Sequence, residues 1–256
     1  MIRNYLKIAL RQLRNQKMYS TIKIGGFALS IAACILITLF ILHELSYDRS
    51  NPDAAQVYRV VGNLRMDGNI LRGPSMPAPF AKTIKADYPE VEKAGRLMSN
   101  QLFGGAGSNQ IRPLGVKENT YEEGFCFADQ ETIDILHIPI IKGKPAAVLT
   151  EPFSLLISAR KAQQFFPGQN PVGKTMIFND NENRPLTIGG VMADPPENSH
   201  LQYDYYISLA GTSFWDGEQD EWLSSNYDIY TKLKAGTDVR AFEKKLSKGI
   251  LQNYMI

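Results

Sequence analysis

The chain has 256 residues, of which 44% are hydrophobic and 21% are charged. That length suffices for one large domain or two small ones with a packed core. The formal net charge of +2 argues against a general nucleic-acid binder. The two cysteines are too few for a disulfide framework or a structural zinc site.

Basic residues concentrate at the N-terminus. The first 23 residues contain six Lys or Arg side chains and no acidic one, and residues 24–43 carry no charge before Glu44. A helix of that uncharged length, at about 1.5 Å per residue, reaches roughly 30 Å, the thickness of the hydrocarbon core of a bilayer. The pattern predicts one transmembrane helix over 24–43. Because Lys and Arg are retained in the cytoplasm, residues 1–23 are predicted to be cytoplasmic and residues 44–256 to face outward.

The basic side chains within the first 18 residues recur at helical spacing. Those that share a predicted helical face are Arg3, Lys7, Arg11 and Arg14. Roughly opposite lie Ile2, Tyr5, Ala9 and Leu13, while Leu10 falls on the basic side and blurs the pattern. The spacing suits either a basic amphipathic helix in the membrane interface or a charged flank that only sets topology. Both interpretations stay open.

The alternatives to a membrane anchor are a cleaved signal peptide and a buried core helix. Ile31–Cys34 matches the loose pattern of a lipoprotein cleavage site, but the apolar run continues through Ile35–Leu42, where a mature lipoprotein turns polar. A buried core helix is disfavoured by the length of the segment and its basic flank. We therefore predict that the span stays attached as an anchor.

The remainder of the chain mixes strand-like and helix-like segments. Strands are predicted at Val57–Val61, Phe153–Ile157, 174–179, 186–193, 203–209 and Tyr227–Leu233. Helices are predicted at Phe80–Tyr88, 129–138, Ser158–Phe166 and from Thr237 or Asp238 to about Tyr254. Turns or loops are predicted at Asp67–Gly68, Gly73–Pro79 and Asn179–Asn183, and Leu102–Gly115 is glycine-rich with few core candidates. This mixture, without a regular βαβ rhythm, indicates an α+β fold.

One segment imitates a nucleotide-binding motif. Gly168–Thr175 fits the P-loop pattern G-x-x-x-x-G-K-[ST] at every specified position. A functional P-loop follows a buried strand and opens a helix, whereas here a helical segment precedes the match and a strand follows it. Pro171 also removes one backbone N–H donor, and only Asp194 is an arguable magnesium ligand. We interpret the match as a false P-loop that forms a helix-to-strand turn.

The histidines indicate no catalytic or metal site. His43, His137 and His200 have no metal-ligand spacing with one another or with a cysteine, and each is predicted to be structural or solvated. Ser199 and His200 near Asp194 do not make a triad, because neighbours in sequence rarely point at one another correctly.

Cys126 and the two tryptophans likewise favour packing roles. Cys126 lies between two phenylalanines and is predicted to be a small buried hydrophobe. Trp215 and Trp222 have acidic neighbours, which suits a binding surface, although local packing is the favoured interpretation. We therefore predict no catalytic, cofactor-binding or metal-binding residue, no cofactor and no enzymatic activity.

A series of motifs in chain order resembles the start of ABC transporter permeases of the MacB/FtsX type, above all the large versions found in Bacteroidetes-like bacteria. The motifs are Asn4–Arg11, the apolar span, Glu44–Arg49, Val57–Val60, Tyr88–Val91, Gly143–Pro145, Asn170–Thr175 and Asp194–His200. Together they extend over nearly the whole chain. The resemblance also accounts for the false P-loop, because N-P-V-G-K-T is a recurrent turn of the periplasmic core domain in this family.

The resemblance implies an inner-membrane protein in which residues 44–256 form a two-lobed periplasmic core domain, with an inserted lobe at roughly 100–210. ATP hydrolysis would belong to a cytoplasmic ABC ATPase subunit. The permease would transmit the conformational change to its periplasmic domain for export of peptide, lipoprotein or drug-like cargo. The implied partners are that ATPase, a permease dimer or second permease half, a periplasmic cargo or adaptor protein, and membrane lipid.

The chain departs from the family pattern in two respects. It stops at Ile256, before a second span, and is expected to be a truncated product, an expressed fragment or the opening segment of a longer permease. Gly104–Gly107 matches no family motif. The alternative function is a single-span, membrane-anchored periplasmic binding or sensor domain without transport activity of its own.

Overall fold

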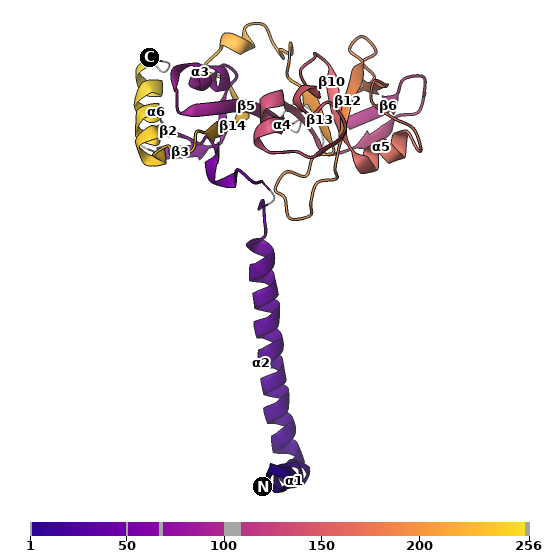
Figure 1. The fold of residues 1–256 in the computed structure, drawn as a ribbon, viewed down its shortest axis with the longest axis vertical. Coiled ribbons are helices and arrows are strands. Elements are labelled where there is room, and N and C mark those ends of the chain that lie inside the picture. The colour runs from indigo at the N-terminus through magenta and orange to yellow at the C-terminus, as the bar shows by residue number, and fades with distance from the viewer. Residues whose placement is uncertain (1, 50, 67–68, 100–108, 254–256) are drawn as a thin grey trace. The chain divides into compact units, whose positions relative to one another are not determined.

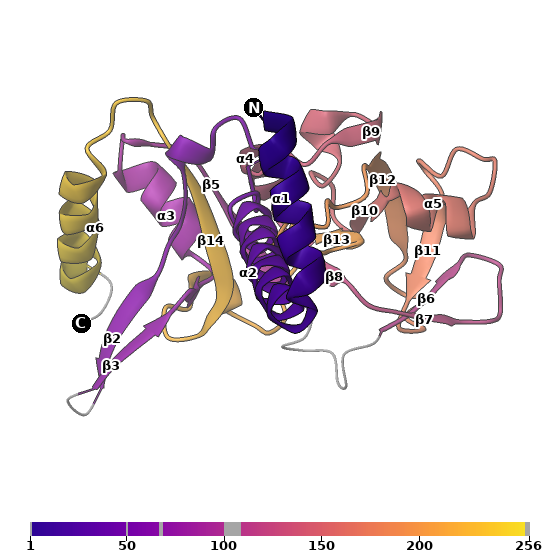
Figure 2. The same cartoon turned by 90° about the horizontal axis from the view of Figure 1, so that it is seen from below.

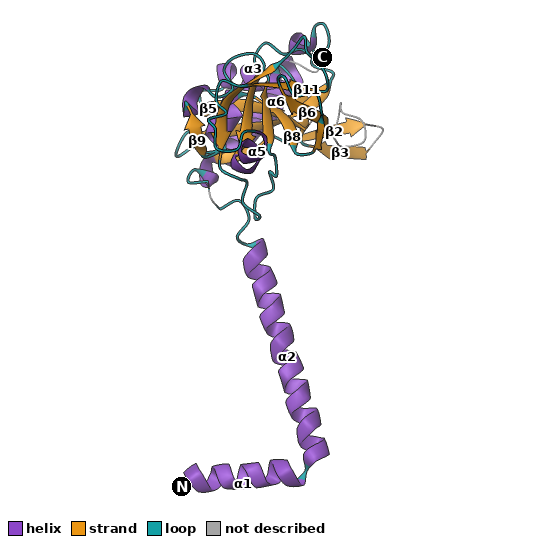
Figure 3. Cartoon of the chain, turned by 90° about the vertical axis from the view of Figure 1, so that its right-hand side faces the viewer, coloured by secondary structure: helices purple, strands orange, loops and turns teal. Residues whose placement is uncertain are grey.

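The computed structural model describes residues 2–49, 51–66, 69–99 and 109–253, and the chain divides into two units, residues 1–48 and 49–256. The first unit consists of helix α1 (Ile2–Asn15) and the 28-residue helix α2 (Lys17–Glu44). The backbone leaves the helical conformation at Gln16, with φ −114° and ψ 56°, and α1 runs crosswise to α2 (Figure 3). Helix α2 contains the whole predicted span and begins seven residues before it.

The second unit contains four α-helices and fourteen strands among its described residues. The helices are α3 (Phe80–Asp87), α4 (Gln130–Ile135), α5 (Ala159–Phe165) and α6 (Val239–Asn253). The strands are β1 (Val57–Arg59), β2 (Gly62–Met66), β3 (Asn69–Gly73), β4 (Ser75–Pro77), β5 (Val91–Ser99), β6 (Asn109–Pro113), β7 (Thr120–Glu122), β8 (Phe125–Ala128), β9 (Ile140–Gly143), β10 (Ser154–Ser158), β11 (Thr175–Phe178), β12 (Leu186–Met192), β13 (Tyr205–Ser208) and β14 (Ser225–Leu233).

Twelve strands form one mixed sheet in the order β1-β14-β5-β8-β13-β10-β12-β11-β6-β7, with β4 paired to β14 and β9 to β12 (Figure 1). The pairs β10–β12 and β8–β13 are parallel, and the other pairs of this sheet are antiparallel. Strands β2 and β3 form a separate antiparallel ribbon (Figure 2). This architecture confirms the predicted α+β class.

The order of the strands follows the chain in two blocks. Strands β6–β13, from residues 109–208, occupy one continuous part of the sheet, whereas β1, β4, β5 and β14 occupy the other. The second block thus combines segments from both ends of the unit. The inserted lobe at roughly 100–210 stays a prediction, as do its boundaries.

The core explains why β10 and β13 are continuous apolar runs. Leu155 and Ile157 enter one buried cluster, while Leu156 between them enters another. Tyr205 and Tyr206 divide between the same two clusters. Both faces of these central strands are therefore buried, and an alternating polar pattern would place polar side chains in the core. A third cluster lies between β5, β14 and the helices α3 and α6.

Most of the predicted elements are confirmed, with ends shifted by a few residues. They include β1, β10–β14, α3, α4 and α5. The final helix is α6, which Asp238 caps by accepting a hydrogen bond from the backbone N–H of Ala241 at 3.1 Å. The Asp67–Gly68 turn and Tyr254 lie outside the described residues, although β2 and β3 pair on either side of that turn.

The predicted loop at Gly73–Pro79 was wrong in part, and the glycine-rich stretch Leu102–Gly115 contains a strand that was not predicted. Gly73–Pro79 contains β4, which pairs with β14. Leu102–Gly115 contains β6, where Ile111 is fully buried against β11 and β7. A single apolar residue between polar neighbours gave too weak a pattern to predict that strand. Gly104–Gly107 lies outside the described residues.

Candidate functional site

Helix α2 presents an exposed apolar surface along its length. Phe27 is 71% exposed and Leu36 is 67% exposed, and α2 buries none of its residues in its own unit. Within the described residues it is the one helix long and apolar enough to cross a membrane. Burying such side chains in lipid removes them from water, which favours a membrane location.

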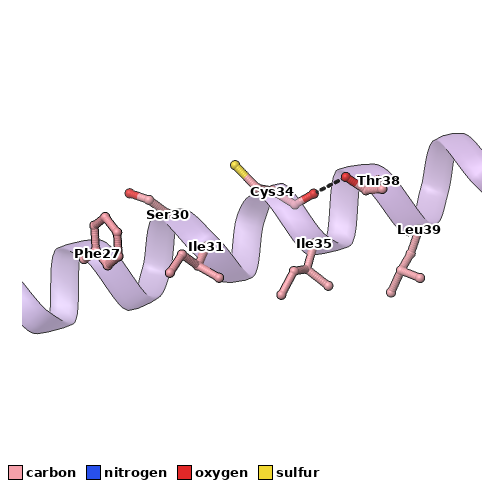
Figure 4. A pocket seen from close by; sticks show the side chains of 7 residues that line it. All are labelled: Phe27, Ser30, Ile31, Cys34, Ile35, Thr38 and Leu39. Carbon is pink, nitrogen blue, oxygen red and sulfur yellow. Dashed lines mark hydrogen bonds between the residues drawn. The ribbon is translucent and has the colours of Figure 1, made fainter.

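The hydroxyl groups in the apolar part of α2 are hydrogen-bonded within the helix. Ser30, Cys34 and Thr38 point to one side of the helix, away from Ile31 and Ile35 (Figure 4). The Ser30 hydroxyl donates to the Gly26 carbonyl at 2.9 Å, and the Thr38 hydroxyl donates to the Cys34 carbonyl at 2.8 Å. These bonds remove the cost of placing hydroxyl groups in hydrocarbon. The helix therefore suits a bilayer despite its serine and threonine.

Helix α1 carries exposed side chains of opposite character. Lys7, Arg11 and Arg14 are exposed, and so are Tyr5 and Ile8, at 68% and 60%. Helix α1 runs crosswise to α2 at the N-terminal end of α2 (Figure 3). That geometry suits a helix in the membrane interface, and the two interpretations of residues 1–18 stay predictions.

The segment that follows α2 is fastened to the sheet unit; we call residues 51–59 the strap. The Asn51 amide donates to the Ile135 carbonyl at 2.9 Å, one of the carbonyls left without an intrahelical partner at the end of α4. Asn51 also accepts a hydrogen bond from the backbone N–H of Asp53 at 2.9 Å, which shapes a local turn. The strap therefore begins at the C-terminal end of α4.

Asp53 is the charged centre of the strap. Its Oδ2 atom lies 2.7 Å from Lys232 Nζ on β14 and 2.9 Å from His137 Nε2. The hydrogen bonds from Lys232 and His137 lower the pKa of Asp53 below its ordinary value. Lys232 also lies 3.3 Å from Glu92 on β5. The contacts join three segments that are far apart in sequence.

His137 occupies an unusual backbone position. Its N–H donates to the Asp134 carbonyl and that of Ile138 to the Ile133 carbonyl, at 3.3 and 3.2 Å, the two hydrogen bonds of a Schellman motif after α4. Its φ of 51° lies in the left-handed region, which usually takes glycine. From its sequence context His137 is predicted to be structural or solvated, and its contact with Asp53 was not predicted. The sequence offered one signal for this contact. The predicted helix ends without the glycine that usually occupies the left-handed position after a helix, which indicates that another residue takes that position.

The P-loop match forms the turn between α5 and β11. Two of its backbone N–H groups are bound within the domain: that of Gly173 donates to the Ile188 carbonyl at 2.8 Å and that of Lys174 to the Pro171 carbonyl at 2.9 Å. The Lys174 ammonium is hydrogen-bonded to Gln169 and lies 4.8 Å from the centre of the Phe166 ring. Donors that would hold a phosphate are therefore used to hold the turn.

The remaining candidates have packing contacts. The ring of His43 meets Tyr47 edge-on at 5.4 Å, and His200 Nε2 lies 3.1 Å from the Tyr230 hydroxyl. Cys126 is completely buried, as predicted, and burial raises the pKa of its thiol well above the ordinary value. No group of three His, Cys, Asp or Glu side chains that could hold a metal occurs within the described residues.

The tryptophans belong to a loop that is tied to the sheet. Trp215 Nε1 donates to Glu221 at 2.8 Å, and Trp222 packs edge-on against Phe80 on α3. Glu218, almost fully buried, accepts hydrogen bonds from the Tyr227 hydroxyl at 2.6 Å and from the backbone of the same loop. These contacts favour local packing for both tryptophans.

Comparison with known proteins settles the family. The family model described as the MacB-like periplasmic core domain matches residues 20–248, which is most of the chain. The chain belongs to the MacB-like periplasmic core domain family. A search of curated proteins found no match. The match confirms the resemblance to MacB/FtsX-type ABC permeases, and it extends over most of helix α2 and nearly all of the sheet unit.

Solved structures share the fold of this MacB-like chain. A domain of a permease protein from Porphyromonas gingivalis aligns with a TM-score of 0.65 and 20% identity, covering 79% of this chain and 86% of that one. The periplasmic region of MacB from Actinobacillus actinomycetemcomitans aligns with a TM-score of 0.53 and 14% identity, covering 78% and 86%. At these identities the likeness establishes a common fold.

Proposed function

We propose that the chain supplies the first span and the periplasmic core domain of an ABC transporter permease subunit in the bacterial inner membrane. Helix α2 crosses the membrane, residues 1–23 are cytoplasmic and residues 44–256 are periplasmic. The domain receives an ATP-driven conformational change and uses it to export peptide, lipoprotein or drug-like cargo. The single observation that carries the proposal is the family match over 20–248 on a chain with a membrane-length helix.

The partners follow from this function. A cytoplasmic ABC ATPase subunit supplies the energy, and a second permease half completes the membrane part. A periplasmic cargo or adaptor protein meets the domain, and α1 contacts membrane lipid. The P-loop match takes no part in ATP hydrolysis, a conclusion supported by the committed backbone donors and by the reversed order of α5, turn and β11.

The orientation can be tested by cysteine labelling in intact spheroplasts. In a Cys34→Ala background, an impermeant maleimide is applied to Lys117→Cys and, separately, to Asn15→Cys, because both positions are exposed. We expect Lys117→Cys to react in intact spheroplasts and Asn15→Cys only after the membrane is opened. The buried Cys126 serves as an internal control that stays unlabelled while the domain is folded. The reverse pattern would overturn the orientation.

Transport can be separated from the sensor or binding alternative by nucleotide dependence. The permease, purified together with its ATPase, is labelled at Val61→Cys, an exposed position just after the strap. ATP with vanadate should change the labelling rate if the ATPase cycle moves the domain. A labelling rate that does not depend on nucleotide would favour an anchored binding or sensor domain. So would failure of an ATPase to co-purify with the permease.

A further inference from the structure

We propose that Asp53 fastens the strap to β14 and α4, so that the strap and β14 move as one body and displacement of α2 is delivered to β14. The inference rests on the proposed function and names the residue that performs its coupling step. Asp53 acts by positioning the backbone of the strap. Its partners Lys232 and His137 come from two different elements of the domain.

The connection between α2 and the strap is short. Only residues 45–50 separate the end of α2 from Asn51. Fully extended, that segment reaches at most about 20 Å, at roughly 3.3–3.6 Å per residue. Its first part is also curled, because the N–H groups of Ser46 and Tyr47 donate to the carbonyls of His43 and Glu44. A displacement of α2 therefore pulls on the strap and is not absorbed by a long linker.

The strap continues as a strand beside β14. Val57 pairs with Lys232 and Arg59 pairs with Tyr230. The N–H of Val60 extends this ladder by donating to the Ile229 carbonyl at 2.9 Å. β1 is only three residues long, and a ladder so short gives weak holding by itself. The ion pair of Asp53 with Lys232 lies immediately before the ladder and reinforces it.

The conformation of His137 supports a role for its side chain. The Schellman position would be relaxed with glycine, yet the chain places there a residue whose imidazole reaches Asp53. A residue with a strained backbone is retained where its side chain makes a functional contact. For His137 that contact is the hydrogen bond with Asp53 from the end of α4.

β14 passes the displacement onward. It pairs with β5 along its length and leads, five residues after its end, into α6. Phe242 of α6 packs edge-on against Tyr88, and Lys245 of α6 lies 2.7 Å from Glu90. The segments that enter and leave the domain therefore meet through β14, and the block of strands from 109–208 is not needed to connect them.

Hydrogen exchange on the full chain in nanodiscs tests whether Asp53 holds the strap. We expect Asp53→Asn to speed exchange at residues 54–60 roughly fivefold, because the carboxylate charge that pairs with Lys232 is removed and the remaining hydrogen bonds are weaker, and to leave β10 and β13 unchanged. Glu92→Gln is the matched control, since Glu92 also contacts Lys232 but lies outside the strap. Unchanged exchange at 54–60 in Asp53→Asn would overturn the proposal.

His137→Gly separates strap release from general destabilisation. The substitution removes the imidazole and relieves the left-handed backbone, so exchange at 54–60 should rise while the unfolding temperature of the domain holds or increases. A drop in unfolding temperature with no change in exchange at 54–60 would show that His137 acts only in the packing of α4, and would contradict the proposal.

The coupling role is read from the vanadate response at Val61→Cys. Asp53→Asn should weaken the response while ATP hydrolysis continues, and Glu92→Gln should keep it unchanged. An equal response in Asp53→Asn overturns the coupling role. No response in the unsubstituted complex overturns the proposed function and the coupling role with it, whereas the exchange result still reports whether Asp53 holds the strap.

Discussion

Arg96 on β5 and Asp129 before α4 are joined by a double ion pair that also includes the backbone. Arg96 Nε lies 2.8 Å from Asp129 Oδ2, and Nη2 lies 2.9 Å from Oδ1. The backbone N–H of Arg96 donates to Asp129 Oδ2, and that of Asp129 donates to the Arg96 carbonyl. Arg96 additionally donates a hydrogen bond to Gln219, which connects the loop containing Trp215 and Trp222 to this ion pair.

Removing the charge of Asp129 is expected to destabilise the domain. Only 14% of the Arg96 side chain and 18% of the Asp129 side chain are exposed, so Asp129→Asn leaves a largely buried guanidinium without its counter-charge. We expect a loss of about 2–3 kcal/mol in the free energy of unfolding, measured with urea. Glu131→Gln, at the exposed pair with Lys85, should change it by less than about 0.5 kcal/mol. Equal effects would contradict the burial argument.

Gly95 is required by the close approach of α4 to β5. A Cβ at this position would lie 2.4 Å from Thr132 Oγ1 and 2.6 Å from its backbone nitrogen, and backbone cannot move aside easily. Gly95→Ala should lower the free energy of unfolding by about 2–3 kcal/mol. Gly73→Ala meets nothing within 4 Å and serves as the control in the same thermal or urea unfolding experiment. An unchanged free energy of unfolding in Gly95→Ala would show that α4 shifts freely away from β5.

Cys126 should be chemically silent in the folded domain. Its thiol is fully buried, and burial raises its pKa, so both access and the thiolate fraction are reduced. In a Cys34→Ala background, maleimide labelling at pH 8 should follow the unfolding transition in urea. Rapid labelling under native conditions would show that β8 opens locally, independently of global unfolding.

Asp228 on β14 gives a pH dependence of known sign. Burial raises the pKa of its carboxyl above the ordinary value, against the opposing influence of Arg59 and His200. The folded state therefore binds the proton more tightly than the unfolded state, and this residue lowers stability as pH rises from about 4 through its folded pKa. Asp228→Asn should remove that part of the slope in urea unfolding between pH 3.5 and 7. An unchanged slope would contradict the shift.

Elements with local signals were predictable from the sequence. Ser158 marks the start of α5, because its hydroxyl accepts a hydrogen bond from the backbone N–H of Lys161 at the N-cap. Asp238 marks the start of α6 in the same way. β5 escaped prediction because Glu92, Lys93 and Gly95 interrupt its apolar residues, although the strand is central to its part of the sheet. Its charged side chains have partners on neighbouring elements, which no local pattern reveals.

The contacts of the strap were not predictable from local sequence patterns either. The Asn51-Pro52-Asp53 turn is legible in the sequence, but Asp53 meets His137 and Lys232, 84 and 179 positions away. Only the fold brings these residues together. The family resemblance, in contrast, depended on motifs spread along the whole chain and was confirmed by the match to residues 20–248.

The pairing of β1 with β14 gives the domain adjacent ends. A domain whose first and last strands are neighbours can be placed between two membrane helices without forcing those helices apart. It can also be exchanged for another domain of the same design while the surrounding spans keep their packing. A chimera joined at residues 49 and 238, which replaces this domain with another MacB-like periplasmic core domain, should therefore fold with its junctions in place.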